Sequence, residues 1–232
     1  MGLRAFAKRA LKGSAILALA AGGFGCRSSE QELIDRFLEA ESRGDNQSVA
    51  LLSMVAFPGE VVEFRVLTVS EERRGPYRVA GLRERVREVE ALRDEQFKRF
   101  GEFRQANYDE LLKLQRLLQD DPERKLDARA AELKRQWDGF REEGRLTMTS
   151  LHEAKQALEW EIRIVQKSLQ RESDPERLTG ETLTKEASVR VTTKEHGEGA
   201  YVVTLTRYDV KNSFGAVVLT RWIVTAVQPE AV

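Results

Sequence analysis

The feature that most constrains the fold is a nearly continuous helical pattern from residue 79 to about residue 173. In its first half, apolar residues recur in three groups spaced eleven residues apart, which corresponds to 3.67 residues per turn. The groups are Val86, Val89 and Leu92, then Phe97, Phe100 and Phe103, then Tyr108, Leu111 and Leu114. This period keeps the side chains on one face of a nearly straight helix. We therefore predict one helix over residues 79–119, about 60 Å long, with a single apolar seam.

A second helical arm follows the sequence QDDPERK at residues 119–125. Asp121 is a suitable N-cap, and Pro122 fits the first position of a new helix. Apolar residues then recur at mostly three- and four-residue steps: Leu126, Ala130, Leu133, Trp137, Phe140, Met148, Leu151, Leu158, Ile162, Val165 and Leu169. Folding the chain back at residues 121–122 pairs these with the first arm, which predicts an antiparallel, coiled-coil-like hairpin. Gly144 leaves open whether the second arm is continuous or kinked.

The segments on either side of the hairpin predict a small α+β body. Residues 28–55 have the pattern of two helices separated by a turn at Gly44. β-Branched residues in near alternation predict a strand at residues 60–72 and a meander of strands over residues 187–227. The predicted fold class is α+β. N-terminal helices pack on a curved antiparallel sheet of about four strands, and the hairpin is inserted after the first strand.

The first 25 residues have the three parts of a secretory signal. They begin with four basic residues and no acidic one: Arg4, Lys8, Arg9 and Lys12. The apolar stretch that follows, at about residues 15–21, is far shorter than the roughly 20 residues of a membrane-spanning helix. Without this segment the chain holds 34 basic and 38 acidic residues, a net charge of about −4. A mixed, slightly acidic chain of this kind argues against nucleic acid as a partner.

Cys26, the only cysteine of the chain, directly follows this signal. The sequence GFGC at residues 23–26 resembles the lipobox of bacterial lipoproteins, although Gly23 stands where that family usually has leucine. The resemblance implies cleavage between Gly25 and Cys26. It also implies a diacylglycerol thioether and further acylation, such as palmitate, on Cys26. Several acyl chains on one residue would anchor the protein stably to a membrane.

The residue after the cysteine bears on localisation. Arg27 occupies the position where an aspartate would resemble the inner-membrane retention signal of enteric bacteria. The resemblance therefore implies the periplasmic face of the outer membrane in a two-membrane bacterium. The alternative is an ordinary signal peptide cleaved earlier, for example after Ala21, with Cys26 as a free thiol. The predicted parts of the chain are the signal peptide (residues 1–25), the first body segment (26–78), the hairpin (79–173) and the second body segment (174–232).

The two body segments also carry a family resemblance. Residues 33–52, LIDRFLEAESRGDNQSVALL, resemble the opening of small bacterial lipoproteins of the nuclear-transport-factor-two-like, or cystatin-like, class. The matching residues are Phe37, Leu38, Ala40, Gly44, Asp45, Ala50, Leu51 and Leu52. The closing sequence TRWIVTAV at residues 220–227 looks like the last hairpin of that class. The resemblance implies a curved sheet with a concave pocket, and the hairpin stands where the class has a short connection.

No catalytic, cofactor-binding or metal-binding motif is present in the sequence. Paired cysteines, a His-Glu-x-x-His motif, a phosphate-binding glycine loop and a nucleophile elbow are all missing. The two histidines, His152 and His196, have charged or glycine-rich neighbours and are expected to be solvated. The candidate contact residues are aromatic: Phe97, Phe100, Phe103, Tyr108, Trp137 and Phe140. They form either the hairpin seam, which we favour, or a binding surface.

These patterns lead to three functional hypotheses. The first is a membrane-anchored, non-enzymatic lipoprotein whose hairpin contacts a protein partner, associates with itself or sets a spacing. The second is small-ligand binding or acid–base catalysis in the concave pocket of the cystatin-like body. The third is a periplasmic adaptor of the efflux type, which also inserts a helical hairpin into a β domain. The third ranks last because the flanking segments show no recognisable lipoyl halves.

Overall fold

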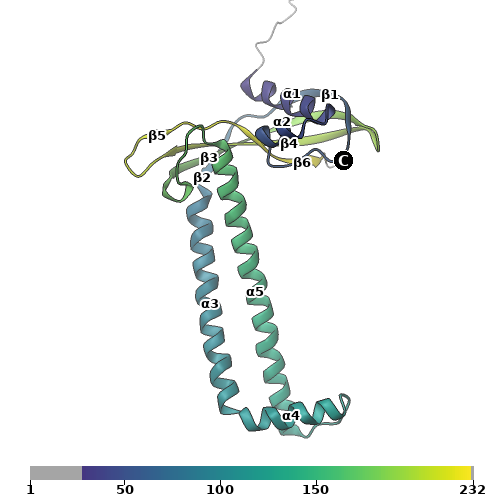
Figure 1. The fold of residues 1–232 in the computed structure, drawn as a ribbon, viewed down its shortest axis with the longest axis vertical. Coiled ribbons are helices and arrows are strands. Elements are labelled where there is room, and N and C mark those ends of the chain that lie inside the picture. The colour runs from purple at the N-terminus through teal and green to yellow at the C-terminus, as the bar shows by residue number, and fades with distance from the viewer. Residues whose placement is uncertain (1–27, 231–232) are drawn as a thin grey trace, which may run out of the picture.

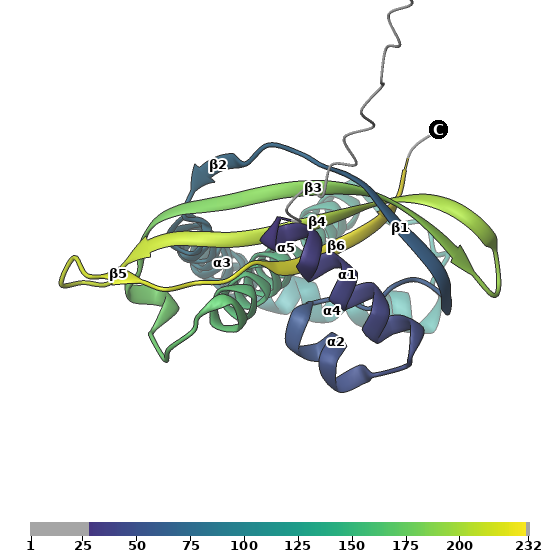
Figure 2. The same ribbon diagram turned by 90° about the horizontal axis from the view of Figure 1, so that it is seen from above.

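The computed structural model describes residues 28–230, which form an α+β protein with five α-helices and one six-stranded antiparallel sheet (Figure 1). The predicted combination of helices with an antiparallel sheet is confirmed. Two N-terminal helices lie on one face of the sheet, and a pair of long helices projects from the other face (Figures 1 and 2). The signal, Gly25 and Cys26 lie outside the described residues, so their roles stay predictions.

The N-terminal helices are α1 (Ser29–Ser42) and α2 (Asn46–Leu52). The turn between them contains Gly44, whose φ of +66° lies in the left-handed region that glycine adopts without strain. Ile34, Phe37 and Leu38 are fully buried on the face of α1 that packs on the sheet. Buried apolar residues of the sheet, and Trp222 just before β6, belong to the same cluster; the sheet residues are Leu183, Ala187, Val189, Val191, Tyr201, Val203, Leu205 and Val224. The space between α1 and the sheet is therefore filled by apolar side chains.

The sheet is built around one long β-hairpin. Its strands are β1 (Val61–Val69), β2 (Arg73–Pro76), β3 (Thr179–Thr193), β4 (Gly197–Lys211), β5 (Val217–Val218) and β6 (Ile223–Pro229). β1 and β2 pair with β3, while β5 and β6 pair with β4. Six strands are present where the sequence predicts about four. The two additional strands, β2 and β5, are too short or too polar to show apolar alternation.

Three helices follow β2 and precede β3, so the helical segment comes after the second strand and not, as predicted, after the first. They are α3 (Arg78–Ala106), α4 (Tyr108–Asp120) and α5 (Ala128–Ser168), and a short 3₁₀ helix, Pro175–Arg177, leads from α5 to β3. α3 and α5 run side by side away from the sheet, and α4 crosses their far ends (Figure 1). The helical rise gives lengths of about 43 Å for α3 and about 60 Å for α5.

The single straight helix predicted over residues 79–119 is wrong, because the chain bends at Asn107. This residue leaves the helical conformation, with φ −117° and ψ 20°, and its side-chain Nδ2 donates a hydrogen bond to the carbonyl oxygen of Phe103 (2.8 Å). Asparagine competes in this way with the helical backbone pattern. The eleven-residue period continues across the bend, so periodicity alone gives no sign of it. The bend turns α4 across the hairpin, where Leu114 and Leu133 are both buried.

The second arm also begins later than predicted. Asp121 is not the N-cap of α5; it accepts a hydrogen bond from the backbone N–H of Glu123 (3.1 Å) in a turn. Asp127 caps the helix instead by accepting from the N–H of Ala130 (2.8 Å). From there α5 continues without interruption through Gly144 to Ser168, which settles the alternative that the sequence left open.

Candidate functional site

The base of the hairpin, which we define as Tyr77, Arg78, Glu161, Pro175 and Tyr208, joins the long helices to the sheet. The hydroxyl of Tyr208, on β4, donates to Oε1 of Glu161, on α5, at 2.9 Å. The hydroxyl of Tyr77 donates to the carbonyl oxygen of Pro175 at 2.7 Å. Arg78 lies 3.7 Å from the other oxygen of Glu161, whose side chain is 4% exposed. Each buried polar group at this junction therefore has a partner.

Burial also affects the ionisation of the two tyrosines at the base. Desolvation raises the pKa of the Tyr208 hydroxyl well above its usual value, and the negative charge of Glu161 raises it further. The pKa of Tyr77 is raised by the same two causes. Both hydroxyls are therefore neutral hydrogen-bond donors at physiological pH. The base has the character of a structural joint, because its polar groups face one another and not an open cavity.

Beyond the base, apolar residues form the seam between α3 and α5. Val86 and Val89 on α3 pack with Leu151 and Ala154 on α5. Four of the predicted aromatic residues meet farther along: Phe100, Phe103, Trp137 and Phe140. The ring centroids of Phe100 and Trp137 lie 5.1 Å apart, and those of Phe103 and Phe140 lie 4.9 Å apart. For these four residues the seam interpretation agrees with the structure.

The other two candidate aromatic residues lie outside the seam. The side chain of Phe97 is 59% exposed and that of Tyr108 is 57% exposed. Leu92, which the eleven-residue pattern also assigns to the seam, is 57% exposed. The predicted seam is thus too wide, because only part of a face can contact a single neighbouring helix. Large apolar side chains are left on the surface of the distal half of the hairpin.

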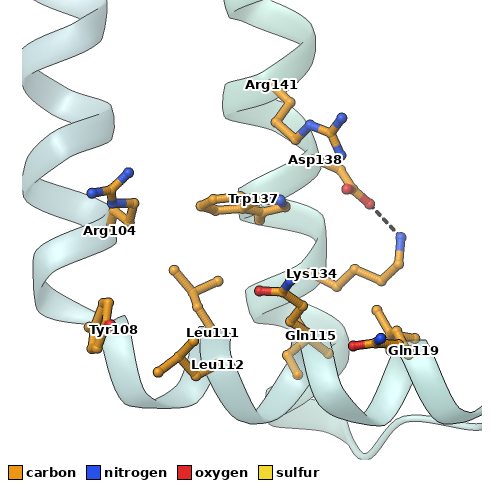
Figure 3. A pocket seen from close by; sticks show the side chains of 12 residues that line it. Arg104, Tyr108, Leu111, Leu112, Gln115, Gln119, Lys134, Trp137, Asp138 and Arg141 are labelled. Carbon is orange, nitrogen blue, oxygen red and sulfur yellow. Dashed lines mark hydrogen bonds and ion pairs between the residues drawn. The ribbon is translucent and has the colours of Figure 1, made fainter.

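A cleft of about 730 Å³ lies beside Tyr108 where α3, α4 and α5 meet (Figure 3). We call it the elbow cleft and define it by its lining: Arg104, Tyr108, Leu111, Leu112, Leu114, Gln115, Leu118, Gln119, Lys134, Trp137, Asp138 and Arg141. Figure 3 shows Leu111, Leu112 and the ring of Trp137 lying between α3 and α5. Apolar side chains therefore form the centre of the cleft. Its opening faces solvent at the end of the hairpin far from the sheet.

The charged groups of the elbow cleft are mainly basic. Lys134 forms an ion pair with Asp138 (2.5 Å), which neutralises the single acidic residue of the lining. Arg104 and Arg141 are exposed, and within residues 28–230 neither forms an ion pair. Several neighbouring arginines differ in this respect. Arg145, for example, pairs with Glu142 at 2.6 Å. The cleft therefore combines an apolar centre with two uncompensated guanidinium groups.

A second groove, of about 610 Å³, extends the elbow cleft along α3. It is lined by Phe97, Phe100, Gly101, Arg104, Gln105 and Tyr108. Arg104 and Tyr108 belong to both linings, so the two hollows are adjacent. Together they form one apolar surface that contains the two exposed aromatic residues of the candidate set. An exposed surface of large apolar side chains next to charged ones is typical of protein-binding sites.

Sequence reasoning identified part of this site and missed part of it. Tyr108 and Trp137 stood among the predicted contact residues, whereas Arg104, Leu112 and Arg141 did not. Leu112 could have been recognised from the sequence. The sequence LLKLQRLL at residues 111–118 places leucines on more of the helix than one seam can bury. Arg104 and Arg141 could not have been recognised in this way, because only the folded structure shows which of many arginines are without an acidic neighbour.

Other kinds of site receive no support from the described part of the chain. Residues 28–230 contain no group of three metal-ligating side chains. His152 and His196 are both exposed. The face of the sheet below α1, where a cystatin-like pocket is expected, is occupied by the apolar core. Among the described helices, none is both long and apolar enough to cross a bilayer.

The fold and the elbow cleft define an α+β protein with a long helical hairpin and an open apolar cleft at its end. Comparisons with protein-family models, with characterised proteins and with solved structures give no match. The function of the chain is therefore inferred from its own chemistry.

Proposed function

We propose that this chain is a non-enzymatic bacterial lipoprotein, anchored through lipidated Cys26, that presents a protein-docking site at the end of its hairpin. The observation that carries the proposal is the elbow cleft. Tyr108 and Phe97 are more than half exposed beside it, and Trp137 lines it. Exposing large apolar side chains is unfavourable unless a partner covers them. Aromatic residues and arginine are also the types that contribute most to protein interfaces.

The arrangement of the body supports a projecting role for the hairpin. α1 begins at Ser29, only three residues after Cys26, and packs on the face of the sheet opposite the hairpin (Figures 1 and 2). Three residues span at most about 10 Å. An anchor at Cys26 would therefore hold the sheet next to the bilayer. The elbow cleft would then lie on the side away from the membrane, beyond about 40 Å of hairpin.

The proposal includes the location and the domain arrangement expected from the sequence. The anchored face would be the periplasmic side of the outer membrane, in agreement with Arg27 after the cysteine. The body would be a cystatin-like α+β domain, and the hairpin an insertion into it. The partner would be a protein in the same compartment. No observation of comparable weight favours a ligand pocket in the body or an adaptor role.

Two measurements test the proposal on the full chain produced in a bacterium. The first is the intact mass of the membrane-extracted protein. We expect a mass that lacks residues 1–25 and includes acyl groups on Cys26. A free thiol at Cys26, or cleavage at another site, would refute the anchor.

The second measurement tests the docking site by photo-crosslinking in cells. A photoreactive residue replaces Leu112 in the elbow cleft or, as the matched control, the exposed Ala91 in the middle of α3. We expect discrete adducts from position 112 that are several times more abundant than those from position 91. Tyr108→Ala should remove them without lowering the amount of protein, because this side chain lines the cleft and is already more than half exposed. Equal labelling at the two positions would refute a docking site at the elbow.

A further inference from the structure

We infer that the elbow cleft binds an acidic amphipathic helix of a partner protein. This inference rests on the proposed function, in which the cleft is a docking site, and it adds the chemistry of the partner. It is argued from the shape of the cleft and from its two uncompensated arginines. The repulsion between those arginines in two facing copies of this chain is a third ground.

The shape of the cleft suits a helix. Its centre is apolar and lies between the antiparallel α3 and α5, with α4 crossing at one end (Figure 3). The adjoining groove along α3 lengthens it toward Phe97. Amphipathic helices bind such grooves by inserting apolar side chains spaced three, four and seven residues apart. The long direction of the apolar surface follows α3, so a bound helix would lie along this arm.

The charges of the cleft select an acidic helix. Arg104 and Arg141 come from the two different arms of the hairpin and have no acidic partner in the described chain. Carboxylates on both flanks of an inserted apolar face would meet these two guanidinium groups. Such charge-assisted hydrogen bonds are favourable because arginine can pair with a carboxylate through two N–H groups. Lys134 and Asp138 already neutralise each other and add no preference.

The same charges disfavour a second copy of this chain. In a two-fold symmetric contact the same patch faces itself, so two pairs of uncompensated arginines would approach each other. The only acidic residue of the lining, Asp138, is held by Lys134 and could not balance them. An apolar cleft with like charges at its edges is therefore better suited to a different protein. Cleft-to-cleft dimerisation would contradict the inference.

The test uses the full-length lipidated protein in detergent and a panel of helical peptides. All peptides share a leucine- and tryptophan-rich apolar face, in several spacings, and differ only in flanking residues, which are glutamate, glutamine or lysine. We expect the best glutamate peptide to bind about tenfold more tightly than its lysine counterpart, since two partly exposed ion pairs are gained. The preference should weaken as salt is raised. Fluorescence anisotropy gives the Kd values.

A charge reversal makes the test specific to the two arginines. Arg104→Glu with Arg141→Glu should invert the order, so that the lysine peptide binds more tightly. The matched control is Lys98→Glu with Lys113→Glu, which reverses two exposed lysines outside the lining of the elbow cleft. The control should keep the preference for the glutamate peptide. Circular dichroism of both double variants verifies that the hairpin remains folded.

Failure of this inference can be distinguished from failure of the proposed function. If the photoreactive residue at position 112 gives specific adducts, but no peptide binds or the flanking charge has no effect, the partner chemistry is wrong and the docking site stands. If the adduct consists of two copies of this chain, the partner is the chain itself and the inference is overturned. If position 112 gives no specific adduct, the docking site itself is refuted.

Discussion

At its base the hairpin buries two tyrosines and a carboxylate, whereas at its elbow a tyrosine, a tryptophan and two arginines line an open cleft. Tyr208, on β4 where the sheet meets the hairpin, is 2% exposed, whereas Tyr108, on α4, is 57% exposed. The hydroxyl of Tyr208 donates to Glu161. Arg104 and Arg141 have no ionic partner in residues 28–230. The polar groups at the base are paired with one another. At the elbow, large apolar side chains are exposed and two guanidinium groups have no ionic partner among the described residues.

Because of this difference, the two ends are expected to respond to substitution in different ways. Removing a side chain at the base leaves a cavity or an unpaired buried group, so it lowers stability. Removing an exposed side chain at the elbow, such as that of Tyr108, uncovers little that was buried, so it leaves stability nearly unchanged and affects binding. Three pairs of variants test this contrast.

The first prediction compares the same substitution at the two ends. Tyr208→Ala is expected to lower the free energy of unfolding by about 3 to 5 kcal/mol, the range for removing a large buried aromatic side chain. Tyr108→Ala is expected to lower it by less than about 1 kcal/mol, because most of that side chain is already in water. Urea unfolding followed by circular dichroism measures both values. Similar losses at the two positions would show that the elbow is as tightly packed as the base.

The sequence predicts the seam better than it predicts the ends of the helices. Periodicity places Val86, Val89 and Leu151 correctly, because a buried stripe must repeat with the helical turn. It fails at Asn107, where a side-chain hydrogen bond to a backbone carbonyl ends the helix inside an unbroken apolar pattern. It also places the start of the second arm at Asp121 and not at Asp127. Both aspartates are good caps, and only tertiary packing selects between them.

The candidate site was predictable only in part, for a related physical reason. An aromatic residue such as Trp137 can be recognised as a candidate from its type alone. Whether it is covered depends on how α4 crosses the hairpin, and the bend at Asn107 determines that crossing. Whether Arg104 forms an ion pair is equally hard to predict from the sequence, because it depends on which acidic side chains are within reach in the folded chain. Local patterns carry no information about such long-range neighbours.

The second prediction isolates the hydrogen bond at the base. Tyr208→Phe is expected to lower the free energy of unfolding by about 1 to 3 kcal/mol, since Oε1 of the buried Glu161 loses its donor. The matched control is Tyr201→Phe on the same strand. Its ring is buried, but its hydroxyl makes no hydrogen bond within residues 28–230, so a change within about 0.5 kcal/mol is expected. Thermal or urea unfolding of both variants provides the comparison.

The same variant also changes the dependence of stability on pH. The pKa of Tyr208 is raised in the folded protein, so its contribution is fully present below the unfolded pKa of about 10. Above that pH the unfolded state loses the proton first, and wild-type stability falls as pH rises. In Tyr208→Phe the fall above pH 10 should be shallower, and Tyr77, whose pKa is also raised, accounts for part of the remainder. An unchanged slope would contradict a buried, neutral Tyr208.

The third prediction tests whether one continuous helix connects the two ends. Gly144 lies inside α5, and a Cβ there would be 3.7 Å from Nε2 of Gln96, an ordinary contact distance. Gly144→Ala is therefore expected to stabilise the protein by up to about 1 kcal/mol, since alanine loses less backbone entropy than glycine in a helix. Gly139→Ala, which meets no atom within 4 Å, is the matched control and should give a similar gain. A loss confined to Gly144→Ala would mean that α5 is kinked there, and the elbow would then no longer be rigidly connected to the base.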